Sequence, residues 1–313
     1  MPAPTAPLEA WEGELQALED LGITTVVAAD HFTQGYAFEP MIALTAAAGC
    51  TNTLRLQTGV LGNDYRHPVL VHRMAALLDV VSAGRFTLGL GAGWMTSDYE
   101  AAGIPLDAPA VRIDRLEEAL DVIVGLFGDA PCTFEGDHYQ VAALDGLPKP
   151  VQRPHPPLFI GGGSPRVLRL AGTRADIAGI NASLRAGSLG AHAISDLSLE
   201  RVCEKIRWVC EARDAAGRGA DAVELEMNQW LAKVTPSAAA ASDLLERMAS
   251  RHGVDVELIA ASPAVLVGTA AQIVDTLQRR RESLGVSTVQ LDAGFPAPDV
   301  HAFAPVIAEL AGT

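Results

Sequence analysis

Residues 84–94 read Gly-Arg-Phe-Thr-Leu-Gly-Leu-Gly-Ala-Gly-Trp, and this stretch decides the fold class of the chain. Phe86–Leu90 has the length and flanks of a short buried strand. It ends in Gly91-Ala92-Gly93, where the missing side chains let another group approach the backbone closely. An amphipathic helix starts near Val111, so the segment predicts one strand–loop–helix unit of an α/β protein. From spacing alone, a tight turn and a ligand cradle are equally good interpretations of the glycines.

The same alternation of strand and helix continues along the chain. Strands are predicted at 24–29, 54–60, 86–90, 158–160, 176–180, 222–234 and 288–291. Helices are predicted between them, and the loops rich in glycine and polar residues follow the strands. This arrangement favours a TIM (β/α)8 barrel, with residues 1–313 as a single domain.

The start of the chain does not fit a regular barrel. The proline-rich segment 1–7 offers nothing apolar before the first helix, where the first strand of the barrel belongs. Either residues before Met1 supply that strand or the barrel closes in an unusual way. We expect residues 1–7 to be disordered or the start of a truncated chain. The small, polar segment 182–198 is expected to be a mobile insertion loop.

Composition limits the partners of the chain. The formal net charge is −15 over 313 residues, with no basic tract to offset it, which argues against nucleic acid and anionic membranes. The four cysteines form no CxxC pair and the start lacks the pattern of a secretory signal. No run is long enough to span a membrane. These features predict a cytoplasmic protein.

Five motifs together resemble the luciferase-like monooxygenase family, and within it the branch that depends on coenzyme F420. They are Asp30-His31-Phe32, Thr58–Leu61, Gly84–Trp94, Arg112–Glu118 and Pro157–Gly163. The resemblance implies a TIM barrel with the coenzyme across the carboxyl ends of the strands. It implies an oxidoreductase that transfers hydride between F420 and a small organic substrate.

The resemblance places Asp30 and His31 beside the ring where hydride is exchanged. Histidine titrates near neutral pH, so it suits the proton transfer that accompanies hydride transfer. A strand-end histidine that only caps loop backbone is the alternative interpretation. Arg66 and Tyr99 lie on later segments and are weaker candidates for contact with substrate.

The implied cofactor site draws on four strand ends. Gly59-Val60 falls where the family has a non-prolyl cis peptide against the middle ring, and Asn63 follows it. Gly161-Gly162-Gly163-Ser164 precedes a helix and offers backbone amides to a phosphate. The full set of expected cofactor residues is Gly59, Val60, Asn63, Gly91, Ala92, Gly93, Trp94, Gly161, Gly162, Gly163, Ser164 and Asn181.

Three alternatives to an F420 enzyme stay open. FMN in place of F420 would make the protein a monooxygenase that uses reduced flavin and oxygen. A metal-dependent barrel hydrolase needs several converging ligands, and the sequence has no HxH or HExxH motif, so no metal is expected. The third alternative is a flavin-binding relative without turnover. The family also implies a homodimer.

Overall fold

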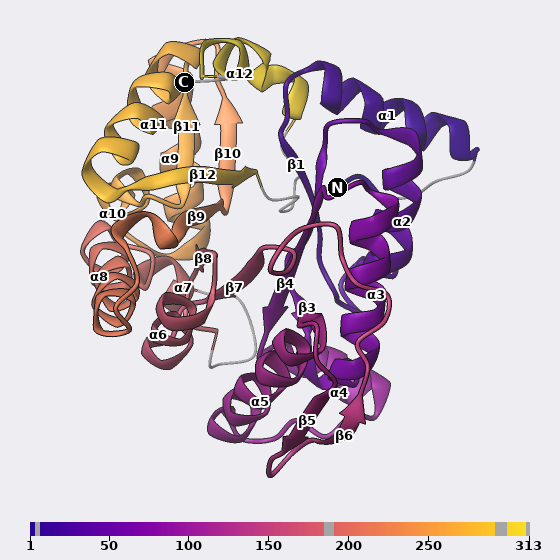
Figure 1. Ribbon diagram of the computed structural model, residues 1–313. Coiled ribbons are helices and arrows are strands. Elements are labelled where there is room, and N and C mark those ends of the chain that lie inside the picture. The colour runs from indigo at the N-terminus through magenta and orange to yellow at the C-terminus, as the bar shows by residue number, and fades with distance from the viewer. Residues whose placement is uncertain (4–6, 185–190, 292–298, 311–313) are drawn as a thin grey trace. The chain divides into compact units, whose positions relative to one another are not determined.

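The computed structural model describes residues 1–3, 7–184, 191–291 and 299–310. The chain divides into two compact units, Met1–Gly161 and Gly162–Thr313, and each is described by itself (Figure 1).

The sheet of the first unit is parallel, as predicted. Its strands are β1 (Thr25–Ala28), β2 (Arg55–Thr58), β4 (Phe86–Gly91) and β7 (Leu158–Gly162), in this spatial order. A two-residue strand β3 (Leu61–Gly62) continues beside β4 beyond the end of β2. Every residue of β4 is buried, which agrees with its apolar sequence. The carboxyl ends of these strands share one edge, since the strands are parallel.

The helices of the first unit follow the predicted spacing. They are α1 (Leu8–Asp20), α2 (Pro40–Cys50), α3 (Pro68–Val81), α4 (Thr96–Ala102) and α5 (Pro109–Phe127). In Figure 1, α1, α2 and α3 follow one another along the same side of the sheet. The predicted hairpin is present as β5 (Cys132–Glu135) and β6 (Gln140–Leu144), beside α5. The sequence pattern did not indicate helix α4, the short strand β3 or the 3-10 turn at Asn63–Tyr65.

Arg85 joins the end of α2 to the start of β4. Its guanidinium donates to the carbonyl oxygens of Ala48, Thr51, Leu54 and Ser82, at distances of 2.8–3.0 Å. Two of these carbonyls lie at the carboxyl end of α2, where helical carbonyls lack partners within the helix. One side chain therefore satisfies several backbone acceptors at the foot of the sheet.

Glycine at position 89 permits the closest strand approach in the unit. A Cβ atom built there would lie 1.8 Å from the carbonyl oxygen of Thr58. The Thr58 hydroxyl accepts from the Gly89 amide at 2.7 Å and donates to the Gly89 carbonyl at 2.9 Å. These two hydrogen bonds take the place of the backbone ladder where the chain leaves β2. The absence of a side chain at Gly89 therefore determines the course of the backbone at residues 59–60.

No strand precedes β1 among residues 1–3 and 7–24, in agreement with the expectation of a missing first strand. The carbonyls of Thr24 and Ala28 accept amides of the β2 segment, so by alternation the Val27 carbonyl points to the other edge of β1. The α-ammonium group of Met1 donates to that carbonyl at 2.8 Å. Disorder of residues 1–7 stays a prediction, since residues 4–6 lie outside the described residues.

The second unit has its own parallel strands. β8 (Ile177–Ile180), β9 (Glu224–Gln229) and β12 (Val286–Leu291) form one group, and β10 (Leu231–Val234) pairs with β11 (Val265–Gly268). Its helices are α6 (Pro165–Arg174), α7 (Ala191–Ser195), α8 (Leu199–Ala215), α9 (Ala238–His252), α10 (Val256–Ala261), α11 (Ala270–Leu284) and α12 (Ala304–Leu310). The expected insertion 182–198 contains α7, and residues 185–190 lie outside the described residues. Its mobility stays a prediction.

The substitution Gly89→Ala tests the close approach of β4 to β2. We expect it to lower the free energy of unfolding by about 3 kcal/mol or more, because the added methyl group meets a backbone oxygen that has no rotamer to change. Gly13→Ala is the control, since nothing lies within 4 Å of a Cβ at that position in α1. The control should raise stability by about 0.5–1 kcal/mol. Equal urea midpoints for Gly89→Ala and the parent would contradict this account.

The second fold prediction concerns acid. His72 in α3 is 1% exposed, its ring lies 4.8 Å from that of Phe127, and its Nε2 has no partner among the described residues. Burial, with the nearby positive charges of Lys149 and Arg73, lowers its pKa from 6.5 to about 4. The unfolded chain therefore takes up a proton first, and stability falls as the pH drops below 6.5 toward 4.

Between pH 7.5 and pH 5 this one histidine should remove about 2 kcal/mol of stability. The variant His72→Met has no titrating group at the position, so its loss over the same interval should be smaller by that amount. Urea unfolding at the two pH values measures both differences. Parallel losses in parent and variant would show that His72 does not cause the acid sensitivity.

Candidate functional site

His31 forms a short hydrogen bond with a buried carboxylate that the sequence did not single out. His31 follows β1 at its carboxyl end, and Asp98 lies in α4. His31 Nδ1 and Asp98 Oδ2 are 2.6 Å apart, and the side chains are 16% and 0% exposed. The two residues are 67 positions apart in the chain, so neither periodicity nor motif spacing links them.

The other oxygen of Asp98 holds the loop after His31. Asp98 Oδ1 accepts from the amides of Phe32 at 3.2 Å and Thr33 at 3.0 Å, and from the Thr33 hydroxyl at 2.6 Å. Burial alone would raise the pKa of this carboxyl, but the hydrogen bonds from Thr33 and His31 outweigh it and lower the pKa. Asp98 is therefore an anion, and all four hydrogen bonds of its carboxylate are with residues 31–33.

Aromatic rings surround the His31 imidazole. The ring of Tyr36 lies 4.7 Å away and that of Trp94 lies 5.6 Å away in an edge-on arrangement. The rings of Phe32 and Tyr65 lie 4.5 Å apart and are tilted by 40° to one another, and Phe32 is 46% exposed. Trp94 was predicted as a cofactor residue, and the structure brings it to the predicted catalytic histidine.

Asp30 lies in an ion pair of its own. Arg66 binds both oxygens of Asp30, at 2.5 and 3.1 Å, and also Glu39 at 2.7 Å. The Gly62 amide donates to Asp30 at 3.0 Å, and the carboxylate is 4% exposed. Burial would lower the pKa of Arg66, but the two carboxylates outweigh it and raise the pKa. Direct roles for Asp30 in catalysis and for Arg66 in substrate binding stay predictions, since both are engaged within the protein.

Val60 fits between two of the predicted cofactor glycines. A Cβ at Gly91 would lie 2.5 Å from Val60 Cγ2, and one at Gly161 would lie 3.5 Å from Val60 Cγ1. The Gly59–Val60 peptide is cis, as expected. The tips of β2, β4 and β7 thus meet around one branched side chain at the edge that also carries His31.

Hydrogen bonds from α5 hold the Gly91-Ala92-Gly93 loop in place. Arg112 of α5 donates to the carbonyls of Ala92, at 3.0 Å, and Gly93. Gly93 has φ +74, and a Cβ there would collide with the Tyr99 hydroxyl. Steric constraints within the protein therefore require glycine at position 93, in addition to the predicted role of the loop in the site. Arg112 belongs to one of the five family motifs, and the sequence alone does not predict its contact with this loop.

Tyr99 is 1% exposed, and its hydroxyl donates to Asp64 at 2.9 Å. Burial, the negative charge of Asp64 and their hydrogen bond raise its pKa. Its position under Gly93 gives it a packing role, and contact with substrate stays a prediction.

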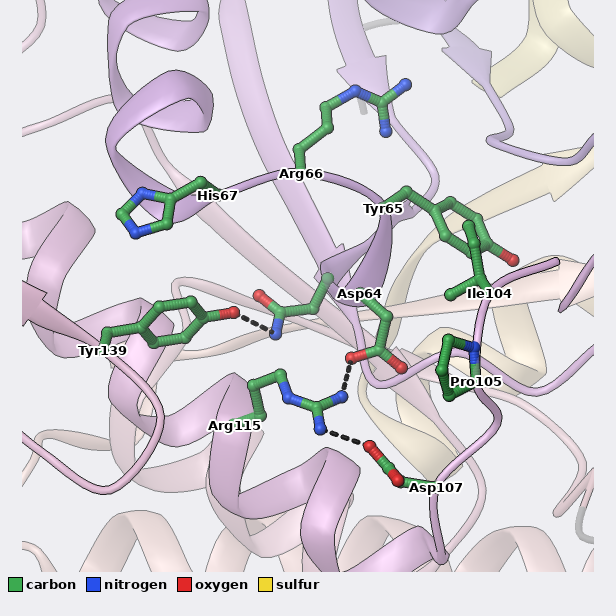
Figure 2. A pocket seen from close by; sticks show the side chains of 10 residues that line it. Asp64, Tyr65, Arg66, His67, Ile104, Pro105, Asp107, Arg115 and Tyr139 are labelled. Atoms are coloured by element: carbon green, nitrogen blue, oxygen red, sulfur yellow. Dashed lines mark hydrogen bonds and ion pairs between the residues drawn. The ribbon is translucent and has the colours of Figure 1, made fainter. Parts of the chain in front are cut away.

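A cavity of about 390 Å³ opens next to this cluster (Figure 2). Ten residues line it: Asn63, Asp64, Tyr65, Arg66, His67, Ile104, Pro105, Asp107, Arg115 and Tyr139. Arg115 bridges Asp64, at 2.6 Å, and Asp107, and Asn63 Nδ2 lies 3.4 Å from the Tyr139 hydroxyl. The cavity contains the predicted residues Asn63 and Arg66, and its arginines are each paired with two carboxylates.

The remaining predicted residues lie in the second unit. Ser164 caps α6 through its hydroxyl, which accepts from the Val167 amide at 3.5 Å, and Pro165 occupies the first helical position, as predicted. The backbone amide of Asn181 donates to the Gly162 carbonyl at 3.0 Å. Its side-chain oxygen accepts from Trp230 Nε1 at 3.0 Å.

A Cβ at Gly163 would collide with the backbone of Ala182. Gly163 therefore packs directly against this backbone. The glycine-rich segment leads into α6, and the start of a helix is a place where backbone amides can bind phosphate.

The described residues contain no group of three or more His, Cys, Asp or Glu side chains placed to hold a metal ion. They also contain no helix with both the length and the apolar character that a membrane span requires.

The family model described as luciferase-like monooxygenase matches residues 3–288. The FMNH(2)-dependent dimethylsulfone monooxygenase of Pseudomonas putida is 29% identical over 153 residues, which cover 48% of this chain and 42% of that protein. The F420-dependent glucose-6-phosphate dehydrogenase of Intrasporangium calvum is 31% identical over 166 residues, which cover 50% of this chain and 49% of that protein. The chain thus spans about half the length of the curated relatives it matches.

A solved structure shows the fold. Monooxygenase RslO1 from Streptomyces bottropensis superposes with a TM-score of 0.75 and 21% sequence identity, over 99% of this chain and 94% of that one. The predicted fold class, a luciferase-like α/β protein of the TIM-barrel type, is confirmed.

Proposed function

The chain belongs to the luciferase-like monooxygenase family, and on this premise we propose that it is an oxidoreductase that transfers hydride between coenzyme F420 and a small organic substrate. The observation that carries the proposal is the His31–Asp98 pair at the carboxyl edge of the sheet, at 2.6 Å. A histidine bound to a buried carboxylate is a group that moves protons, and a proton must move whenever hydride is added to or removed from a carbonyl or alcohol.

Each unit carries residues that would suit one part of a phosphorylated three-ring cofactor. Val60 is half-buried between Gly91 and Gly161, and its exposed part would give apolar contact to a ring. Gly161, Gly162, Gly163 and Ser164 would hold the phosphate through backbone amides at the start of α6. Asn63, Ala92, Trp94 and Asn181 complete the proposed cofactor residues. When bound, the deazaflavin supplies the hydride chemistry.

The protein residues supply the proton and the environment. In the direction of substrate reduction, the protonated His31 ring would deliver its Nε2 proton to the substrate oxygen as the carbonyl carbon gains hydride, and the ring would be left neutral. Tyr36 and Trp94 flank the imidazole and exclude water from part of it. In the reverse direction His31 would accept the hydroxyl proton.

FMN is the second candidate cofactor. The FMNH(2)-dependent relative favours it, and the same glycine-rich tip would accept the FMN phosphate. With FMN the protein would use reduced flavin and oxygen as a monooxygenase. We place F420 first because the Asp30-His31 strand end and the Gly-Ala-Gly-Trp loop resemble the deazaflavin branch, and an F420-dependent relative is equally similar.

Titration with F420 and with FMN tests this order. We expect F420 to bind with a Kd in the micromolar range and FMN at least tenfold more weakly, as followed by quenching of cofactor fluorescence. The reverse order would overturn the choice of F420.

The variant His31→Ala should keep the F420 Kd within about threefold. It should lose about 10²-fold or more in turnover of reduced F420 with a panel of small ketones and activated alkenes. Full turnover in that variant would remove His31 from the mechanism.

The location and partners remain proposals of the same kind. All four cysteines are free thiols, consistent with a cytoplasmic protein that acts on a small molecule.

We propose further that the chain forms a homodimer through the outer surface of α2 and α3, here called the α2–α3 face. Its exposed residues are Ile42, Thr45, Ala46, Gly49, Leu70, Arg73, Leu77, Val80 and Val81. Ile42 is 72% exposed, and Leu70, Leu77 and Val81 are more than half exposed. Monomeric proteins rarely leave a contiguous patch of large apolar residues in water.

Charge argues for a second copy as the partner. The chain carries a net charge of −15, so two copies repel over most of their surface. Across α2 and α3 the exposed side chains include no carboxylate, and Arg73 is the single exposed charge. Small residues on α2 beside large ones on α3 let the same surface fit itself across a two-fold axis.

The variant Leu77→Glu places a carboxylate in the centre of this face. We expect sedimentation to change from a dimer to a monomer at micromolar concentration, because two carboxylates would meet in an apolar contact. Leu199→Glu changes an equally exposed leucine of α8 and should leave the dimer intact. A parent protein that sediments as a monomer would contradict the proposal.

A further inference from the structure

We propose that Asp98 is a positioning residue that keeps neutral His31 in the Nδ1–H tautomer and so reserves Nε2 for proton exchange with substrate. The role of Nε2 in proton exchange rests on the proposed function. The tautomer of His31 is a property of the protein alone.

The geometry divides the two oxygens of Asp98 between two tasks. Oδ2 faces His31 Nδ1 at 2.6 Å, and Oδ1 takes all three donors of Phe32 and Thr33. An ionised carboxylate is an acceptor only, so each of its four contacts must be a donor. The proton of neutral His31 is therefore on Nδ1.

The other ring nitrogen has a different environment. Within the described part of the chain, the His31 ring makes no hydrogen bond other than that to Asp98. The side chain keeps 16% of its surface exposed, whereas Asp98 is completely buried. Nε2 thus carries the lone pair that can accept a proton from substrate, or the proton that the charged ring can return.

The alternative is that Asp98 only holds the loop after β1. In that case the hydrogen bonds of Oδ1 would determine the conformation of the loop, and the contact of Oδ2 with His31 would contribute only to stability. The substitution Asp98→Asn separates the two cases, because it keeps the size of the side chain and changes its donors.

The site dictates how an asparagine would sit at position 98. Three donors already converge on the Oδ1 position, so the amide oxygen must occupy it. The NH₂ group then faces His31 and donates to Nδ1, which moves the ring proton to Nε2. Asp98→Asn should therefore invert the tautomer of His31 with little change in fold.

The first measurement uses the ¹⁵N chemical shifts of the imidazole nitrogens in the full-length, cofactor-free protein at high pH. His31 is assigned from the signals that disappear in His31→Gln. We expect Nδ1–H in the parent and Nε2–H in Asp98→Asn. A parent with the proton on Nε2, or an unchanged tautomer in the variant, would overturn the proposal.

The second measurement is turnover with F420 and an active substrate. Asp98→Asn should lose about 10²-fold or more in kcat, with KM and the F420 Kd within about threefold. An inverted tautomer with kcat within threefold of the parent would overturn the positioning role. If the parent does not use F420 at all, the proposed function fails, while the ¹⁵N shifts still decide the tautomer.

Asp79→Asn is the matched control. Asp79 in α3 is also completely buried and accepts the amides of Val151 and Gln152 at 2.7 and 2.9 Å. Its replacement should lower the thermal midpoint by a similar amount. It should leave the His31 tautomer and kcat unchanged within threefold. A loss of kcat in this control equal to that of Asp98→Asn would show that lower stability, and not the tautomer, explains the effect.

Discussion

The close approach of β4 to β2 is the constraint on which the site in the first unit depends. Thr58 and Gly89 exchange hydrogen bonds through a hydroxyl because no side chain separates the two strands there. The chain can then turn at residues 59–60 and continue as β3, and Val60 comes to lie against the bare tips of β4 and β7. The glycines of this region allow the strands of the protein itself to pack closely. The apolar contact that we propose for a cofactor ring would be a consequence of that packing.

A second layer of polar contacts fixes the loops that follow the strands. Asp98 holds the loop after β1, Arg66 ties Asp30 to Glu39, and Arg112 holds the loop after β4. Each contact joins a buried or half-buried charge to backbone or to an opposite charge, so the groups are satisfied without water. The site residues therefore have a fixed geometry before any ligand arrives, which reduces the ordering cost of binding.

The sequence predicted the regular elements of the first unit well, because long apolar runs and capped helices carry strong local signals. It missed α4, whose seven residues are too few to show a period, and the two-residue strand β3. It also missed Asp98, because a contact across 67 residues has no local signature. The single strand expected at 222–234 is two strands, β9 and β10. The Trp230 amide donates to Ala264, so the run changes its pairing partner from β12 to β11 at that residue.

Glu39 belongs to two structures at once. Its carboxylate accepts the Ile42 amide at the start of α2 and also binds Arg66 at 2.7 Å. Loss of this one carboxylate would weaken the helix start and leave Arg66 with Asp30 as its only anionic partner among the described residues. The first turn of α2 and the electrostatic field around Asp30 are therefore thermodynamically linked, so a perturbation at either end is felt at the other.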